Sequence, residues 1–153
     1  MILKSSQNPS LLENTWKLVG FLCGESNDHT KFFLTNSQTP ILNLILAQLN
    51  TPPVSSPMIV KNCLFTLSNI LVEKSAYVDE AVSLGLFDSI FQIWQQVSAF
   101  EKEPNRSREE LDQIMSLREE IIYCIGNCTV AIKDTFLVEG LFLLREVLER
   151  GGL

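Results

Sequence analysis

Two stretches of the sequence pair an aromatic residue with an asparagine four positions later, Phe65 with Asn69 and Tyr123 with Asn127. On a helix, residues four apart share a face, and stacking two such helices side by side would align the pairs into a ladder. A side-chain amide both donates to C=O and accepts from N–H of a strand-like ligand, and an aromatic ring attracts cations. The pattern therefore favours noncovalent recognition of an extended peptide. The alternative is that the asparagines cap or bridge neighbouring turns and the rings belong to the core.

The residue types needed for covalent or metal chemistry are scarce. The sequence has one histidine, His29, and no Gly-rich phosphate loop, Gly-x-Ser-x-Gly elbow or His-Glu-x-x-His motif. Cys124 and Cys128 lie one helical turn apart, but a four-ligand zinc site needs a second pair of ligands, which the sequence does not offer. We therefore expect no enzymatic activity, no cofactor and no metal.

The composition indicates an ordered domain with an acidic balance. Of the 153 residues, 46% are hydrophobic and 20% are charged, and the net charge is −6. This is the composition of a chain with a packed core and not of a disordered tail. Lysine and arginine form no run, so we expect no nucleic-acid partner, whereas an acidic surface favours a basic one.

The sequence predicts neither export nor membrane insertion. Residues 1–8 lack a basic region followed by a long apolar segment. Apolar stretches such as residues 41–49 are shorter than the roughly 20 residues that a membrane-spanning helix needs. We expect a cytoplasmic and/or nuclear protein with no membrane partner, whose four cysteines stay reduced.

These residues must be positioned by helices, because apolar residues recur at helical spacing along almost the whole chain and no segment alternates as a strand would. The predicted class is all-α. Thr39-Pro40 and Ser56-Pro57 each pair an N-capping hydroxyl with proline at the first helical position. Ser107 and Glu110 are spaced as a capping box. These three features predict where three of the helices begin.

An internal repeat organises the helices. At an offset of 58 residues, Leu67-Ser68-Asn69 falls on Ile125-Gly126-Asn127, and the aromatic positions coincide as well. A fainter copy places residues 18–21 in the register of residues 66–69, with Phe21 at the asparagine position. We therefore predict one domain, 1–153, of three stacked units. The units are approximately residues 9–53, 57–100 and 107–151, with an insertion or loop at 95–107 and inner helices around 14–23, 60–72 and 117–131.

A helix that ends in aromatic-x-x-small-Asn, followed by a short helix and a Gly-hydrophobic-aromatic start of a third, resembles the armadillo repeat. The segment from Phe65 to Asn69 with Gly85 downstream is closest to importin-α-like proteins, with phenylalanine in the position that tryptophan holds in that family. The resemblance covers nearly the whole chain, most clearly in the second unit. It implies an α-α superhelix, an armadillo or HEAT-like solenoid of about three repeats.

The resemblance also implies a function. In importin-α-like proteins the equivalent asparagines bind the backbone of an extended peptide, and the aromatic rings flank the aliphatic stems of its lysines and arginines. Carried over, this makes Phe65, Asn69, Tyr123 and Asn127 peptide-binding residues. Glu73, one turn beyond Asn69, would supply negative charge for a basic peptide, unless it is an ordinary solvated carboxylate. No binding rung is expected in the first unit, where Lys17 and Phe21 replace the aromatic residue and the asparagine.

Two functions follow as hypotheses. The first is a protein- or peptide-binding module, in its narrower form an adaptor for basic nuclear-localisation-type peptides. The alternative is a structural or regulatory scaffold for protein assembly without a basic-peptide groove. Solenoid ends expose apolar faces unless polar caps cover them, and no cap is evident. This leaves open a piece of a longer solenoid or ends that bind a partner, and the oligomeric state stays undetermined.

Overall fold

The structure, a computed structural model, describes residues 8–35, 40–50, 56–72, 75–102, 104–131 and 145. These residues form α-helices and no strand, so the all-α prediction is confirmed for them. The helices are α2 (Pro9–Glu25), α3 (Asn27–Thr35), α4 (Ile41–Leu49), α5 (Pro57–Leu71), α6 (Ser75–Ser83), α7 (Leu86–Glu101) and α8 (Arg108–Ala131). In this described part, none of the helices is both long and apolar enough to cross a membrane.

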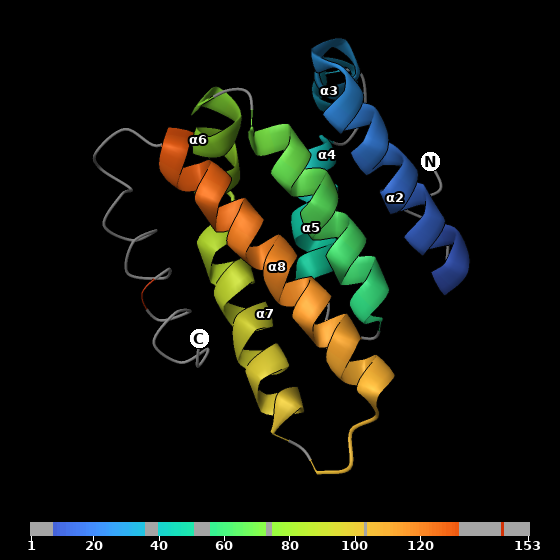
Figure 1. Cartoon of the computed structure of the whole chain (residues 1–153). Coiled ribbons are helices and arrows are strands. Elements are labelled where there is room, and N and C mark those ends of the chain that lie inside the picture. Colours follow the sequence, from blue (N-terminus) through green and yellow to red (C-terminus); the bar gives the residue numbers. More distant parts are fainter. Residues whose placement is uncertain are drawn as a thin grey trace.

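The long helices α2, α5 and α8 lie side by side in one layer (Figure 1). Behind them, α4 packs against α5 and α7, and α7 packs against α8. The shorter α3 and α6 follow the ends of α2 and α5. The core between the two layers is mostly aliphatic and includes Trp16 and Trp94, which are both buried. Burial of these apolar faces is the main source of stability.

Helices α2, α5 and α8 run in the same direction (Figure 1). Hydrogen bonds between α5 and α2 show the register: Asn62 donates to the carbonyl of Glu13, Thr66 to that of Trp16 and Asn69 to that of Gly20. As the residue number of the donor rises along α5, the residue number of the acceptor rises along α2. This order occurs only between parallel helices. Residues 18–21 and 66–69, aligned from the sequence, therefore lie on neighbouring parallel helices.

Two of the three predicted helix starts are found where the sequence places them. Ser107 and Glu110 form the capping box, in which the backbone N–H of Glu110 donates to Ser107 Oγ and the backbone N–H of Ser107 donates to Glu110 Oε2. These bonds to Ser107, with Arg106 nearby, hold the pKa of Glu110 below its ordinary value. Pro57 is the first residue of α5 after the N-cap Ser56, although the Ser56 side chain makes no capping bond.

Two predictions need correction: the helix start at Thr39-Pro40 and the insertion or loop at 95–107. Pro40 is the N-cap of α4 and not its first helical residue, because its ψ of 139° is extended; Thr39 lies outside the described residues. Most of the segment predicted as an insertion or loop, 95–107, is helical, because α7 continues to Glu101 with apolar residues at helical spacing. In the third unit, the described residues are 107–131 and Arg145.

Gly20 sets how closely α5 approaches α2. A Cβ atom at Gly20 would lie 2.6 Å from Cδ1 of Phe65 and 2.9 Å from Oγ1 of Thr66. These distances are shorter than van der Waals contact, so only glycine allows this approach. At Gly126 of α8, in contrast, no described atom lies within 4 Å of the position that a Cβ would take. The two helical glycines therefore differ in what covers them.

We expect Gly20→Ala and Gly126→Ala to change stability in opposite directions. Overpacking costs about 1–3 kcal/mol, which exceeds the gain of at most about 1 kcal/mol that alanine brings to a helix interior, so Gly20→Ala should lower the free energy of unfolding. Gly126→Ala meets no described atom and should raise it by about 0.5–1 kcal/mol. Urea denaturation of both variants measures the difference, and equal effects would contradict the close α2–α5 approach.

Candidate functional site

The structure brings together four of the five residues predicted to bind a peptide. Phe65 and Asn69 lie on α5, and Tyr123 and Asn127 lie on α8, the next helix of the same layer. The fifth, Glu73, lies outside the described residues. We call the surface that carries Phe21, Phe65, Asn69, Tyr123 and Asn127 the ladder face.

Each asparagine of the ladder face bridges to the preceding helix of the layer. Nδ2 of Asn69 donates to the carbonyl of Gly20 at 2.9 Å, and Nδ2 of Asn127 donates to the carbonyl of Ser68 at 3.0 Å. Gly20 and Ser68 occupy the same position of the repeat, one residue before the asparagine position. The bridging role that the sequence left open is therefore present at both asparagines.

The bridge uses only part of each amide. Within the described residues, neither Oδ1 of Asn69 nor Oδ1 of Asn127 accepts a hydrogen bond, and both side chains are partly buried. An amide oxygen has two lone pairs, and Nδ2 carries a second N–H. Both asparagines thus keep acceptor and donor capacity while the bridge fixes their orientation.

A second hydrogen bond repeats one turn earlier. Oγ1 of Thr66 donates to the carbonyl of Trp16 at 2.9 Å, and Sγ of Cys124 donates to the carbonyl of Leu64 at 3.2 Å. Threonine and cysteine thus occupy the same repeat position and make equivalent bonds. Sequence reasoning missed this pair because it treated Cys124 only as a buried thiol; the signal was a donor three residues before each asparagine.

The aromatic residues of the ladder face differ in exposure. Tyr123 is 62% exposed, so the alternative that its ring belongs to the core is wrong. Phe65 is half-buried, with its ring over Gly20 and its edge against Phe21, the two ring centroids being 5.3 Å apart. Phe21, at a position where no binding rung was expected, is also exposed. Sequence reasoning missed Phe21 because only the contact between α2 and α5 joins it to Phe65.

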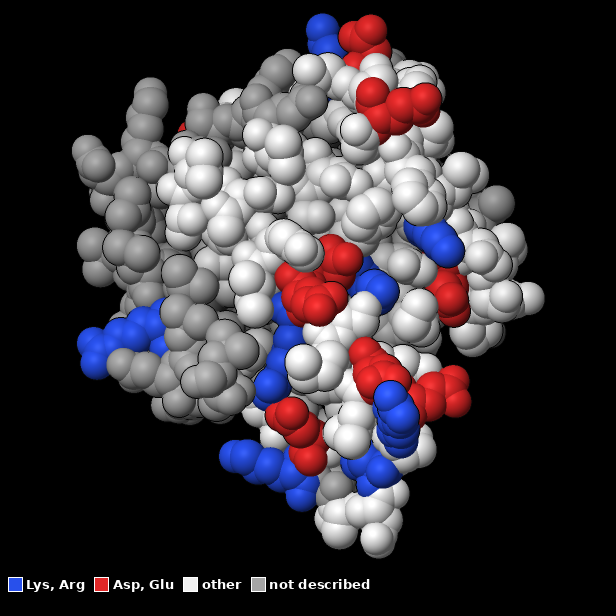
Figure 2. Space-filling view, viewed as in Figure 1, with Lys and Arg blue, Asp and Glu red and all other residues white. Residues whose placement is uncertain are grey.

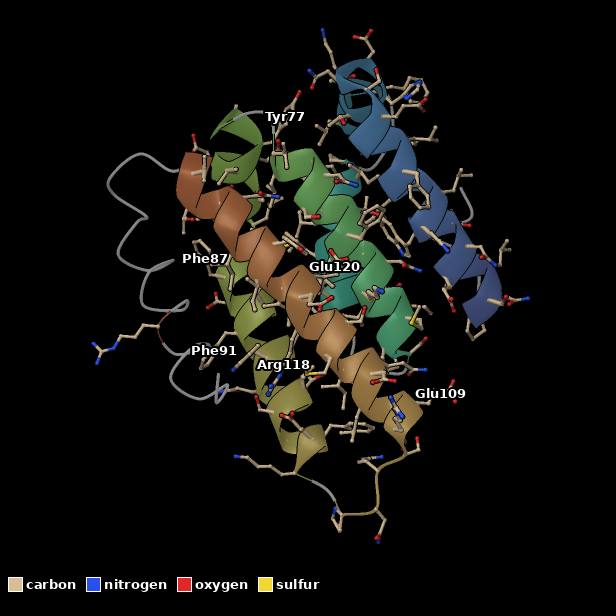
Figure 3. All side chains as sticks on the ribbon, viewed as in Figure 1. Tyr77, Phe87, Phe91, Glu109, Arg118 and Glu120 are labelled. Carbon is tan, nitrogen blue, oxygen red and sulfur yellow. The ribbon has the colours of Figure 1, made fainter. Side chains whose placement is uncertain are left out.

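Acidic side chains gather near the middle of the layer formed by α2, α5 and α8 (Figure 2), where Glu120 points from α8 toward α5 (Figure 3). Burial raises the pKa of Glu120 above its ordinary value; the positive charge of Lys61 lowers it and the negative charge of Glu119 raises it further. Burial is thus the main cause of the raised pKa, and a further cation beside Glu120 would stabilise its charged form.

The four cysteines are buried free thiols. Burial raises the pKa of Cys63 and Cys124 well above the ordinary value and raises the pKa of Cys128 to about 12. Thiols in this state are poor nucleophiles and poor metal ligands, because both roles need the thiolate. Among the described residues, no group of three or more His, Cys, Asp or Glu side chains is arranged to hold a metal ion.

Comparison of the chain with protein-family models, with curated proteins and with solved structures found no match.

The bridging asparagines should contribute to stability. We expect Asn69→Ala and Asn127→Ala each to lower the free energy of unfolding by about 0.5–1.5 kcal/mol, the usual net worth of one hydrogen bond. Asn14→Ala is the matched control, because Nδ2 of Asn14 donates to the carbonyl of Ser10 within its own helix at an exposed position. Denaturant unfolding measures all three variants, and an Asn14→Ala loss as large as the others would refute the bridge.

Glu120 should make stability depend on pH. Because its pKa is higher in the folded protein than in the unfolded chain, the folded state holds the proton more tightly, and stability falls as pH rises from the unfolded pKa through the folded one. We expect Glu120→Gln to raise the melting temperature at pH 7. Below the unfolded pKa of about 4.3 the advantage should vanish, and a gain that is the same at pH 3.5 and pH 7 would rule out this cause.

Proposed function

We propose that this chain is an armadillo-like protein- or peptide-binding module whose ligand is an extended basic peptide lying across the ladder face. The observation that carries the proposal is the repeated bridge from Asn69 and Asn127 to the preceding helix, which uses Nδ2 of each amide and leaves each Oδ1 without a donor among the described residues. An all-helical chain with three parallel helices in one layer supports the same interpretation.

The spacing of the rungs suits an extended chain. Packed helices lie about 8–10 Å apart, and a strand-like peptide rises about 3.3 Å per residue. Amides on neighbouring helices therefore meet backbone groups about three residues apart along a ligand that crosses the helices. Each Oδ1 would accept from a peptide N–H, and the second N–H of Nδ2 would donate to a peptide C=O.

The side chains around the amides favour positive charge. The exposed ring of Tyr123 offers its face to a lysine or arginine, a contact worth about 0.5–1 kcal/mol at an exposed site. Glu119 and Glu120 lie on the same helix, and burial raises the pKa of Glu120. A basic ligand nearby would lower that pKa by stabilising the carboxylate.

The narrower form of the proposal is an adaptor for basic nuclear-localisation-type peptides, in the cytoplasm and/or nucleus. The alternative is a scaffold for protein assembly. The exposed apolar side chains of α2 and α8, which lie at the two edges of the layer, favour the scaffold as the second candidate. The two functions use different surfaces.

Titration with a fluorescent Lys/Arg-rich peptide at low and moderate salt tests the proposal. Tyr123→Ala is the cleanest variant, because Tyr123 is exposed and its loss should not unfold the chain. We expect Tyr123→Ala to weaken binding roughly 2- to 5-fold, the loss of one cation–π contact. Asn127→Ala should weaken it as well, and moderate salt should weaken all complexes.

Gln92→Ala, an exposed change on α7, is the control and should bind as the unmodified chain does. Circular dichroism checks that each variant stays helical. If a complex forms and neither Tyr123→Ala nor Asn127→Ala weakens it, the ladder face is not the site. If no basic peptide binds at all, the adaptor function is wrong and the result favours the scaffold function.

A further inference from the structure

Helices α2 and α8 lie at the two edges of the layer. Each exposes apolar side chains at repeat positions that are buried where two helices of the layer meet, between α2 and α5 or between α5 and α8. Leu18 of α2 is 59% exposed, whereas the equivalent residues Thr66 and Cys124 are completely buried. In those two, the side chain faces the preceding helix and donates to its backbone. Leu11 is likewise exposed where its equivalents, Ile59 and Leu117, are buried. We call the surface of Leu11 and Leu18 the outer face of α2.

At the opposite edge, α8 exposes a repeat position that faces the following helix in the other two units. Ile122 of α8 is 37% exposed, whereas the equivalent Trp16 and Leu64, whose carbonyls accept hydrogen bonds from the following helix, are almost completely buried. Met115 and Gly126 share the same stripe of α8, at seven residues before and four after Ile122. We call the surface of Met115, Ile122 and Gly126 the outer face of α8.

The glycine position gives independent support that the outer face of α8 has no neighbour among the described helices. At Gly20 the ring of Phe65 from the next helix fills the space above the backbone, whereas at Gly126 no described atom lies within 4 Å of an added Cβ. Gly126 is the repeat equivalent of Gly20. The outer face of α8 therefore has a glycine where the surface of α2 accepts α5, and no described atom covers it.

We infer that a second copy of this chain docks head-to-tail, with the outer face of α2 of one copy on the outer face of α8 of the next. The same two kinds of face already meet twice inside the molecule, between α2 and α5 and between α5 and α8. The new contact continues that packing. In the register of the inner bonds, Leu18 of one copy lies over Ile122 of the next, as Thr66 lies over Trp16.

The chemistry favours this pairing over one between identical faces. Each inner contact joins two different faces, and the chain exposes one of each kind at its two edges. Leucine replaces the hydroxyl or thiol donor at position 18, so the contact between copies is apolar, with Leu11 and Leu18 facing Met115 and Ile122. A contact between unlike faces leaves one free face of each kind, so assembly continues to open chains of copies.

Sedimentation velocity of the full chain over a wide concentration range tests the inference. The weight-average mass should rise with concentration beyond that of a dimer. Leu18→Asp and Ile122→Asp each block one of the two faces, so each variant alone should remain a monomer. Mixed in equal amounts, the two variants should form a 1:1 heterodimer and nothing larger, because each supplies the face that the other has lost.

Phe32→Asp is the matched control: Phe32 is a similarly exposed apolar residue, but it lies on α3, and this variant should assemble as the unmodified chain does. Leu18→Gln and Ile122→Gln, checked by circular dichroism, replace either aspartate variant that fails to fold. A chain that is monomeric at every concentration overturns the inference, as does a dimer that survives in either variant alone or a mixture that yields no heterodimer. Basic-peptide binding by the monomeric variants tests the ladder face separately.

Discussion

Side chains that donate to the backbone of the neighbouring helix define the arrangement of this protein. Asn69 and Asn127 make one such bond each, and Thr66 and Cys124 make another one turn earlier. An apolar contact alone would let parallel helices slide or rotate. A bond to one particular carbonyl fixes both the register and the facing surface, because a buried donor that loses its partner costs about 1–3 kcal/mol.

This constraint decides what the ladder face presents. Since Nδ2 of each asparagine is held by the preceding helix, the amide has one orientation, and Oδ1 accepts no hydrogen bond from the described residues. Preorganised polar groups lose less entropy when a ligand binds than mobile ones do. The bridging and peptide-binding roles compete as interpretations of the sequence. The bridge uses one edge of each amide, so the proposed peptide contact would use the other edge.

The contacts between α2 and α5 and between α5 and α8 join the same two kinds of helix surface. One surface of each kind is left exposed, as the outer face of α2 and the outer face of α8. Leu18 and Ile122 stand at repeat positions that are buried wherever a neighbouring helix of the layer covers them. Their exposure is thus a consequence of position in the layer and not of residue type. Binding across the ladder face and docking at the edges would use separate surfaces, so one chain has room for both.

The helical class, the capping box at Ser107 and Glu110 and the equivalence of Asn69 with Asn127 could be predicted from the sequence, because helical periodicity, end-capping and repetition are local patterns. The sequence predicts an insertion or loop at residues 95–107, whereas α7 runs to Glu101, since polar composition alone does not end a helix that packs on a neighbour. Three features could not be predicted without the packed helices: Phe21 contacts Phe65, Cys124 makes the bond equivalent to that of Thr66, and Tyr123 is exposed. Each of these depends on which surfaces of two helices meet, and that is set by contacts about 50 to 60 residues apart in the chain.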